Sequence, residues 1–517
     1  MIAGLLKELA VKFGQYIRFQ VSRGLHRGST SNTPVEQSPP GSIESAVPRT
    51  ITLEIAGGVR VVVPDSPNLI TPYVLYEQQD WFEDELGFLR RILRPGQNAI
   101  DIGANYGVYT LSIANVVGPT GGVWAFEPSS STAAFLAQGI AANRFSHVVL
   151  DTSAISSKCG QAQLTLNDNS ELNALVQDRP LTGNVETVNV VSLDDCLQRY
   201  DWRDIAVVKI DAEGEEARIL EGGRDFLARL SPLILYEIKA GADLHLELVG
   251  QFAACGYRSF RLVAGLDLLV PFDASSVPDG FLLNLFCCKE DTAARLAKQG
   301  LLLDSAALSA PGAGQRSELF FREHAGRYGW RQKLVALPYG AAFAADWETT
   351  QSSDDATAVN EALARFAISQ DTSLDPLTRF SALDSSFRSL QSLCSERPQF
   401  LRLASLARVA RDHGSRAVAV SALSRLLDNI ARDDQVNVCE PFLVPGKRFE
   451  SIAPGQDIGR WALAAFLEEH ERLSSFSSFY TGNSSRPRLA KIASLGFASA
   501  EMTRRMQLLQ LRFPSAK

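Results

Sequence analysis

The 517-residue chain lacks the features of a disulfide-bonded, zinc-binding or membrane-spanning protein. Its seven cysteines are scattered, odd in number and without a C-x-x-C pair, so we expect neither a disulfide framework nor a zinc site. No apolar run approaches the ~18 residues of a membrane span. The chain is therefore expected to carry buried free thiols in a reducing, cytoplasmic compartment.

The sequence also lacks an excess of positive charge. Its 51 Lys and Arg residues against 58 Asp and Glu residues give a formal net charge of −7. No Asn/Asp-Pro-Pro-Tyr motif and no basic, aromatic-laced tract occurs, so we expect no nucleic-acid partner. The length and the 45% hydrophobic content indicate a globular protein of two or three domains.

The first residues show a different pattern from the rest. Residues 1–27 place apolar side chains at near-helical spacing among Lys and Arg, which predicts a basic amphipathic helix. Lys7, Glu8 and Lys12 interrupt any signal-peptide core. Two interpretations stay open: peripheral contact with the inner membrane surface, or packing on the protein's own fold or on a partner. Residues 28–48, rich in Ser, Thr, Pro and Gly, are expected to be a flexible linker.

Residues 49–95 are expected to lead into the main domain. Two alternating strands at 51–56 and 59–63 flank Gly57-Gly58, which predicts a β-hairpin. The stretch 73–93 is predicted to be one helix that ends before Pro95-Gly96. Its residues Tyr73, Glu77 and Trp81 would form a lid over a ligand, unless the helix is an ordinary amphipathic one.

From residue 96 to 292 strands and helices alternate. Strands are expected near 98–102, 123–127, 148–152, 206–211, 233–238, 257–262 and 281–288. This rhythm predicts an α/β fold with a parallel sheet covered on both faces. The last two strands have little room for a crossover helix between them and should pair antiparallel. Residues 160–192 are interpreted as an inserted hairpin that would roof a pocket.

An acid and a glycine-rich turn follow the strand at 98–102. Asp101, Gly103, Asn105 and Gly107 lie in the order D-x-G-x-N-x-G, and Glu127 ends the next strand about 20 residues later, where a carboxylate can bind ribose hydroxyls. Because the second glycine of G-x-G-x-x-G is replaced by Asn, the turn favours a nucleoside cofactor without phosphates, such as S-adenosylmethionine. NAD is excluded only provisionally.

Three further motifs occur downstream in order. They are Phe126-Glu127-Pro128, Lys209-Ile210-Asp211-Ala212-Glu213-Gly214 and Leu235-Tyr236-Glu237, with Ser192-Leu193-Asp194-Asp195 between the first and the second. Together with the turn at 101–107, this set resembles the FkbM-type methyltransferases over approximately residues 70–290. The resemblance implies a class I methyltransferase fold, a Rossmann-like sheet of seven strands with the last strand antiparallel, and S-adenosylmethionine as the cofactor.

The resemblance also implies which residues form the cofactor site. Asp101 would order the turn and reach the amino group of the methionine moiety, directly or through water. Glu127 would bind the ribose, and the adenine would contact Ser153 and Ala154. The close approach of backbone to ligand would be allowed by Gly103, Ala104 and Gly107. The full expected set is Asp101, Gly103, Ala104, Asn105, Gly107, Glu127, Ser153 and Ala154.

Acids at the ends of two later strands are candidates for a general base. If the acceptor is a hydroxyl, its proton must leave as the new bond forms, and a carboxylate can take it. Glu237 is the first choice, with Asp211 and Glu213 as further candidates; Asp211 would alternatively orient a ligand. His245, on an apolar face, is a reserve. No metal is expected, since the acids are assumed to lie at separate corners of the fold.

Residues 300–517 lie outside the resemblance and are predicted to be helical. Residues 403–427 form a helix-turn-helix pattern around His413-Gly414, flanked by helical patterns at 355–369, 376–395, 458–475 and 498–512. This region would bind a protein partner, an acceptor or a second copy of the chain, or would support the fold.

The sequence thus predicts an S-adenosylmethionine-dependent O-methyltransferase. The resemblance points to a hydroxyl of a sugar, a glycolipid or another secondary metabolite as the acceptor. The alternative is a non-catalytic scaffold that keeps a nucleotide-binding fold and acts through its helical C-terminal region.

Overall fold

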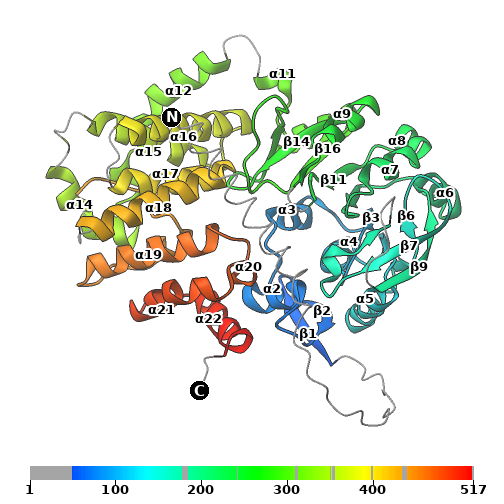
Figure 1. Cartoon of the computed structure of the whole chain (residues 1–517). Helices are drawn as coiled ribbons and strands as arrows, with labels where there is room; N and C mark the ends of the chain where they lie inside the picture. Colours follow the sequence, from blue (N-terminus) through cyan, green and yellow to red (C-terminus); the bar gives the residue numbers. More distant parts are fainter. Residues whose placement is uncertain are drawn as a thin grey trace, which may run out of the picture.

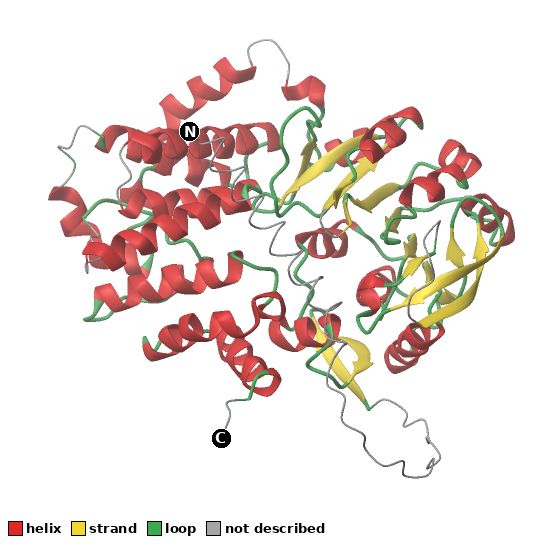
Figure 2. Ribbon diagram, in the orientation of Figure 1, coloured by secondary structure: helices red, strands yellow, loops and turns green. Residues whose placement is uncertain are grey.

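The computed structural model describes most of the chain after residue 48. The described ranges are 49–176, 184–240, 243–308, 313–349, 351, 355–396, 400–433 and 439–514. The helix expected at 1–27 and the linker expected at 28–48 lie outside them. Within them, an α/β half and a helical half lie side by side (Figures 1 and 2). None of the helices in these ranges combines the length and the apolar character that a membrane crossing requires.

The predicted β-hairpin is confirmed at the start of the described chain. β1 (Thr50–Ile55) pairs antiparallel with β2 (Val59–Pro64), and both turn glycines have positive φ. The side chain of Asn143 accepts from the Arg60 backbone N–H at 3.0 Å and donates to its carbonyl at 2.6 Å. Because Asn143 ends α5 (Ser130–Asn143), the hairpin is fixed to the α/β half.

The prediction of one helix over 73–93 is wrong. The structure has two helices, α2 (Ile70–Gln78) and α3 (Asp84–Ile92), and the chain turns between them at Gln79, whose φ is +60°. Arg90 closes this corner by donating to both oxygens of Asp80, at 2.6 and 2.8 Å. Helical spacing continued across the turn in the sequence, and only these tertiary contacts break it.

The central sheet confirms the predicted α/β class. Its order is β15-β14-β16-β11-β10-β3-β4-β5. The bounds are β3 (Asn98–Ile102), β4 (Gly122–Phe126), β5 (Val148–Asp151), β10 (Val207–Ile210), β11 (Leu233–Glu237), β14 (Arg258–Val263), β15 (Leu268–Pro271) and β16 (Asn284–Cys288). The strands from β5 to β11 are parallel, and β16 is antiparallel to both β11 and β14.

One strand of this sheet was not predicted. β15 pairs antiparallel with β14 and adds an eighth strand at the sheet edge, in a stretch interpreted as loop. The turn before it uses Asp267 at φ +56°. Its apolar side chains Leu268 and Val270 are buried against the helical half. A short strand that packs on residues far away in the sequence is hard to predict, because its own few residues show no clear pattern of burial.

Helices cover both faces of the sheet, which explains its apolar strands. Neighbouring residues point to opposite sides, so Ala99 packs with α4 and α5 whereas Ile100 packs with α6 and α8. Both side chains are fully buried. The helices are α4 (Val108–Val117), α5, α6 (Leu193–Arg199), α7 (Glu216–Glu221), α8 (Arg224–Arg229), α9 (Glu247–Ala254) and α10 (Glu290–Lys298).

The segment between β5 and α6 forms a second, smaller sheet. Its order is β6-β9-β7-β8, with β7 and β9 antiparallel as the predicted hairpin requires. The bounds are β6 (Ala154–Ile155), β7 (Gly160–Leu166), η1 (Ser170–Leu172), β8 (Ala174–Leu175) and β9 (Asn184–Val191). Two short strands, β12 (Lys239–Ala240) and β13 (Asp243–Leu244), pair beyond β11.

The C-terminal region is helical, as predicted. Its elements are α11 (Ser305–Leu308), α12 (Ala313–Tyr328), α13 (Trp330–Lys333), α14 (Pro338–Thr349), α15 (Ala356–Ser369), α16 (Pro376–Glu396), α17 (Phe400–His413), α18 (Arg416–Asp433), η2 (Lys447–Ser451), α19 (Ile458–Leu473), α20 (Ser478–Thr481), η3 (Gly482–Ser485), α21 (Arg486–Ser494) and α22 (Ala500–Arg512). The expected helix-turn-helix is α17 and α18, joined at Gly414 with φ +86°.

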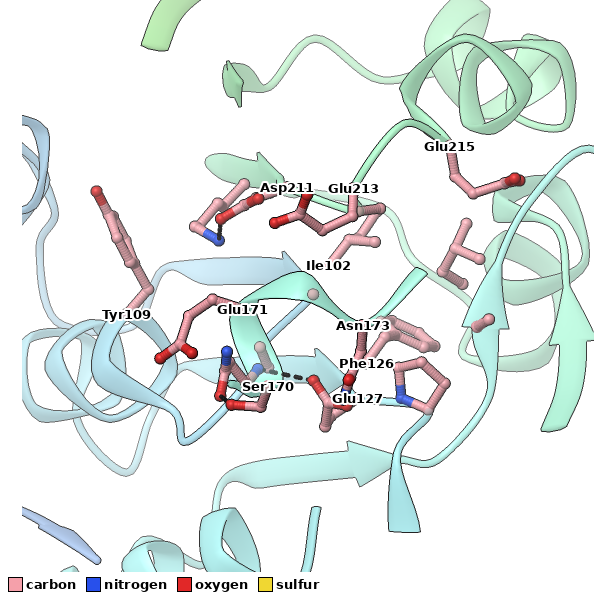
Figure 3. A pocket seen from close by; sticks show the side chains of 18 of the residues that line it. Ile102, Tyr109, Phe126, Glu127, Ser170, Glu171, Asn173, Asp211, Glu213 and Glu215 are labelled. Carbon is pink, nitrogen blue, oxygen red and sulfur yellow. Dashed lines mark hydrogen bonds and ion pairs between the residues drawn. The ribbon is translucent and has the colours of Figure 1, made fainter. Parts of the chain in front are cut away.

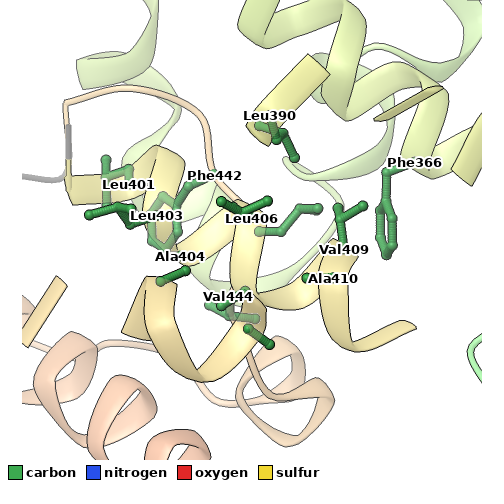
Figure 4. Packing of buried hydrophobic residues seen from close by; sticks show 14 of the residues in the cluster. Phe366, Leu390, Leu401, Leu403, Ala404, Leu406, Val409, Ala410, Phe442 and Val444 are labelled. Carbon is green, nitrogen blue, oxygen red and sulfur yellow. The ribbon is translucent and has the colours of Figure 1, made fainter. Parts of the chain in front are cut away.

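One hydrophobic cluster extends from the helical half into the hairpin of β14 and β15. Leu403, Leu406 and Phe442 lie at its centre (Figure 4), and the hairpin of β14 and β15 contributes Val263. At Gly265, in the same hairpin, the N–H donates to the carbonyl of Asp412 at 3.0 Å, and a Cβ there would lie 2.5 Å from that oxygen. The domain boundary expected between residues 292 and 300 stays a prediction. Experiments on this protein are therefore designed for the full chain.

Candidate functional site

A pocket opens at the carboxyl ends of β3, β4 and β10 (Figure 3). Its walls are the turn after β3 with the start of α4, the end of β4 with residues 153–155, and the loop after β10. The second sheet covers it through Leu164, η1 and β8, so the prediction that the insertion roofs a pocket is confirmed. Ligand sites are expected at this edge of an open α/β sheet.

Every backbone N–H group from residue 103 to residue 107 is bonded within the protein. The acceptors are Phe126 O for Gly103 and Ala104 (3.0 Å each), Glu127 Oε2 for Asn105 (2.9 Å), Asn105 Oδ1 for Tyr106 (2.8 Å), and Ala104 O for Gly107 (2.8 Å). Asn105 has φ +49°, a conformation that Asn tolerates well. The turn is thereby tied to the end of β4 and presents no free N–H to a phosphate group.

The two glycines of the turn serve different purposes. Gly103 lines the pocket at φ +75°, and a Cβ there would lie 1.7 Å from the carbonyl oxygen of Asp211. At Gly107, a Cβ would lie 2.2 Å from Leu136 Cδ1 of α5. Gly107 does not line the pocket, and the expectation that it lets the backbone approach a ligand stays a prediction. Its missing side chain makes room for the core.

Glu127 lies at the end of β4 and organises this corner. It is 7% exposed and lines the pocket. One carboxylate oxygen accepts from Asn105 N, and the other accepts from Ser129 N at 2.9 Å. Burial raises the pKa of Glu127 to about 7, although these two N–H groups act in the opposite direction. Each carboxylate oxygen keeps one lone pair for a ligand donor.

Asp101 lies behind the turn rather than in the pocket wall. It is fully buried, its Oδ2 accepts from Thr110 Oγ1 at 2.6 Å, and its Oδ1 lies 3.8 Å from Lys209 Nζ. Burial raises the pKa of Asp101. The structure supports its expected ordering of the β3–α4 corner. Asp101 does not line the pocket, and its contact with the methionine moiety, directly or through water, stays a prediction.

Two further expected cofactor residues, Ser153 and Ala154, line the pocket just after β5. The backbone N–H of Ser153 donates to Asp151 Oδ1 at 2.9 Å. Asn105 also accepts from Ser170 Oγ of η1 at 2.8 Å, which connects the turn to the covering sheet. The sequence therefore selected residues that the fold does bring to one pocket.

The three candidate bases lie together. Carboxylate oxygens of Asp211, Glu213 and Glu237 are all within 4.8 Å of one another, and the three side chains are half-buried. The assumption that these acids occupy separate corners is wrong, because β10 and β11 are neighbours and end at the same edge. Three converging carboxylates have the spacing to hold a cation, so the stated reason for expecting no metal does not hold.

The crowding of acids changes their protonation. Burial, followed by the charge of Asp211, raises the pKa of Glu213 to about 8. Burial and the charges of Asp211 and Glu213 also raise the pKa of Glu237 well above its ordinary value. Like charges at this distance disfavour full ionisation. Glu213 therefore keeps its proton at neutral pH.

Lys209 is the positive charge beside this cluster. Its Nζ donates to Asp211 Oδ2 at 2.9 Å, lies near Asp101, and sits 5.0 Å from the centre of the Tyr109 ring. Burial alone would lower the pKa of Lys209, but the charges of Asp211 and Asp101 outweigh it and raise the pKa. In the sequence, this role is indicated by a lysine inside the otherwise apolar strand β10.

Four other polar residues of the pocket were not predicted as site residues. Glu83 accepts from the Tyr109 hydroxyl, and Glu171 accepts from the Thr71 hydroxyl. All four line the pocket. They come from the α2–α3 region, α4 and η1. Nothing local in the sequence distinguishes them from surface residues, and only the fold gathers them.

The proposed lid residues separate in the structure. Trp81 lines the pocket, whereas Tyr73 and Glu77 contact Ser478 of the helical half. The reserve candidate His245 does not line the pocket; its Nδ1 lies 2.8 Å from Glu247 Oε1. None of the seven cysteines, all within the described ranges, forms a disulfide.

The chain is similar to a known protein family and to several solved structures. Residues 101–259 match the family model described as methyltransferase FkbM domain. Among curated proteins, none matches this chain. A methyltransferase FkbM structure from Methylobacillus flagellatus KT is 17% identical over 38% of this chain and 45% of its own length, with a TM-score of 0.27. The chain thus spans less than half of that protein.

Two further solved structures show a similar degree of likeness. A SAM-dependent O-methyltransferase from Thermotoga maritima is 11% identical over 46% of this chain and 77% of its own, with a TM-score of 0.24. A SAM-dependent methyltransferase from Aquifex aeolicus is 13% identical over 42% of this chain and 92% of its own length, with a TM-score of 0.25. The range that matches the methyltransferase FkbM domain model, 101–259, contains the turn, Glu127, the Asp211 loop and Glu237.

Proposed function

We propose that the chain is an S-adenosylmethionine-dependent O-methyltransferase that acts on a hydroxyl of a sugar, a glycolipid or another secondary metabolite. The observation that carries the cofactor assignment is the turn at 103–107. All five of its N–H groups are already bonded within the protein. A pyrophosphate would need such groups free, so the turn suits a nucleoside cofactor without phosphates rather than NAD.

The other side chains of the pocket fit that cofactor. Glu127 has one lone pair on each oxygen for the two ribose hydroxyls, and Ser153 with Ala154 provides a small-residue wall for a flat base. Asp211 and Glu213 of the acid cluster line the same pocket, and a carboxylate oxygen of Glu237 lies within 4.8 Å of theirs. Cofactor and acceptor would therefore bind side by side along the sheet edge.

Bound S-adenosylmethionine would supply a methyl group activated by its sulfonium. The protein's part is to orient the acceptor, exclude water and take the hydroxyl proton. The covering sheet provides the exclusion of water through Leu164 and Leu175. For the proton we propose the Asp211–Glu237 pair, with Glu237 as the base in its deprotonated form. Lys209 would hold Asp211 in place.

Calorimetric titration of the full chain with S-adenosylmethionine, and separately with NAD, tests the cofactor assignment. We expect S-adenosylmethionine alone to bind. Glu127→Ala should weaken binding by about 10- to 100-fold, the loss expected for hydrogen bonds to a charged acceptor. Glu54→Ala, at an exposed glutamate of β1, is the control and should bind normally. Binding of neither cofactor would favour the scaffold alternative, and binding of NAD alone would refute the interpretation of the turn.

A further inference from the structure

Asn284 is a buried amide with an unused hydrogen-bond donor. It begins β16, at the sheet edge where β10 and β11 end, and its side chain is 7% exposed. Among the residues that the structure describes, the Nδ2 of Asn284 has no hydrogen-bond partner. A buried donor without an acceptor costs free energy, so such groups are rare in folded proteins. The unused donor therefore indicates an acceptor that becomes available in one state of the protein.

The register of the sheet places Asn284 directly opposite Glu237. The two residues are partners in the antiparallel pair of β11 and β16. In the next pair, Ile238 N donates to the carbonyl of Leu283 at 2.9 Å. Because hydrogen-bonded and non-hydrogen-bonded pairs alternate, Glu237 and Asn284 form a non-hydrogen-bonded pair, the kind whose side chains lie closer together. Their Cβ atoms are then about 4.5–5.5 Å apart, so the amide can reach the carboxylate.

Both side chains lie on the face of the sheet that carries the pocket. Lys209 lines the pocket and is the partner of Leu235 in the parallel pair of β10 and β11. Leu235 is also the partner of Phe286, and both pack in one hydrophobic cluster. Side chains two residues apart in a strand share a face. Glu237, two residues after Leu235, and Asn284, two residues before Phe286, therefore point to the side of Lys209.

Asp211 lies on the other side of Glu237. β11 lies between β10 and β16, and carboxylate oxygens of Asp211 and Glu237 are within 4.8 Å of each other. A protonated Glu237 can donate to Asp211, whereas an ionised Glu237 is repelled by it. The ionised carboxylate can instead accept from Asn284. Glu237 thus has an acceptor on one side and a donor on the other.

We propose that Asn284 is a positioning residue for Glu237: when Glu237 has lost its proton, the amide of Asn284 donates to one carboxylate oxygen and holds the group away from Asp211. The second carboxylate oxygen stays free to take the proton of the acceptor. This inference rests on the proposed function, in which Glu237 is the base. It adds β16, which lies beyond the matched range 101–259, to the elements that prepare the transfer.

The charged and titratable groups that interact with Glu237 come from four neighbouring elements: Asp211 and Glu213 of the loop after β10, Glu216 of α7, Lys239 of β12 and Tyr480 of α20. Burial raises the pKa of Glu237, and the charges of the three acids add to this effect. The ammonium group of Lys239 donates to the carbonyl of Gly280 at 3.0 Å. Asn284 is thus a neutral donor in surroundings that otherwise favour the protonated carboxyl group.

The test measures the ionisation of Glu237 in the full chain. Glutamate carboxyl carbons are labelled with ¹³C, and Glu237→Gln identifies the signal of Glu237 in NMR titrations. Neither cofactor nor acceptor is present, and EDTA keeps cations out of the acid cluster. The variants are Asn284→Val and Asn284→Thr, which are both β-branched and differ by one hydroxyl donor. Tyr236→Phe is the matched control, because it removes a hydrogen bond to Ser259 on the opposite face of β11.

We expect Asn284→Val to raise the pKa of Glu237 by about 1–2 units, the scale of one hydrogen bond to a charged group. Asn284→Thr should raise the pKa less, since its hydroxyl can donate in place of the amide. Tyr236→Phe should leave the pKa of Glu237 unchanged, because the bond that it removes does not involve the carboxylate.

Three results would overturn the inference. They are an unchanged or lower pKa of Glu237 in Asn284→Val, equal shifts in Asn284→Val and Asn284→Thr, and an equal shift in Tyr236→Phe. Thermal unfolding shows whether each variant is folded, and Asn284→Ala replaces Asn284→Val if that variant does not fold. Failure of the wild-type chain to bind S-adenosylmethionine in calorimetry would instead refute the proposed function and would leave the titration result in place.

Discussion

Gly103 lies so close to Asp211 that a Cβ at position 103 would come within 1.7 Å of the Asp211 carbonyl oxygen. This contact joins the turn after β3, which we assign to the cofactor, to the end of β10, which carries the acid cluster. The oxygen belongs to the backbone of a buried sheet edge, so a side chain could not push it aside at low cost. The two parts of the site are thereby held at a fixed spacing.

Gly103→Ala is expected to destabilise the protein by at least about 3 kcal/mol, because the methyl group clashes with backbone in addition to the strain of a positive φ. Gly58→Ala separates the two effects. Gly58 has nearly the same φ, +73° against +75°, but no atom lies within 4 Å of its Cβ position. We expect this control to cost only about 1–2 kcal/mol. Urea unfolding measures both values, and equal losses would contradict the steric argument.

The acid cluster should make stability depend on pH. Glu213 has an ordinary pKa of 4.5 when unfolded and one of about 8 in the fold, so between these values the folded protein holds a proton that the unfolded chain has lost. The free energy of unfolding should therefore fall as the pH rises from about 4.5 to about 8. Glu213→Gln should flatten this slope in urea unfolding at several pH values. The exposed Glu54→Gln should leave the slope unchanged, and a wild-type slope of opposite sign would exclude the proposed protonation.

Removal of the buried cation should be costly. Lys209→Met leaves Asp101 and Asp211 without their positive partner, and breaking a buried pair typically costs about 3–5 kcal/mol. Asp101→Asn in the same chain should restore part of the loss, since it removes one of the stranded charges. Arg203→Met is the surface control. Its ion pair with Asp201 is exposed on both sides, so its loss should leave the free energy of unfolding nearly unchanged. The free energy of unfolding of each variant, measured by chemical denaturation, checks these expectations.

The choice of base can be tested once an acceptor is turned over. Glu237→Gln should lower kcat by about 10²- to 10⁴-fold with the affinity for S-adenosylmethionine unchanged. Because the pKa of Glu237 is raised, kcat of the wild type should increase with pH as the carboxyl group loses its proton. Glu247→Gln, at an exposed position beside His245, is the control. If Asp211→Asn abolishes turnover while Glu237→Gln retains it, Asp211 is the base instead.

The sequence alone determined the local parts of this protein. Strand and turn patterns identified the hairpin at Gly57-Gly58, seven strands of the sheet and the turn from Asp101 to Gly107, because these features depend on the period of burial and on backbone conformations that few residues adopt. The same patterns located Glu127, and the resemblance to the FkbM-type methyltransferases added Ser153 and Ala154; all three line one pocket.

Other features were decided only by the tertiary structure. The break between α2 and α3, the edge strand β15, the role of Gly107 beside Leu136 and the convergence of Asp211, Glu213 and Glu237 all arise from contacts between distant segments. The packing of α20 on α2 is the clearest case. Tyr73 and Ser478 are 405 residues apart in the chain, yet their hydroxyl oxygens lie 2.9 Å apart. The pattern of apolar and polar residues along the chain predicts which residues are buried. Which surface they pack against is decided only when distant segments come together in the fold.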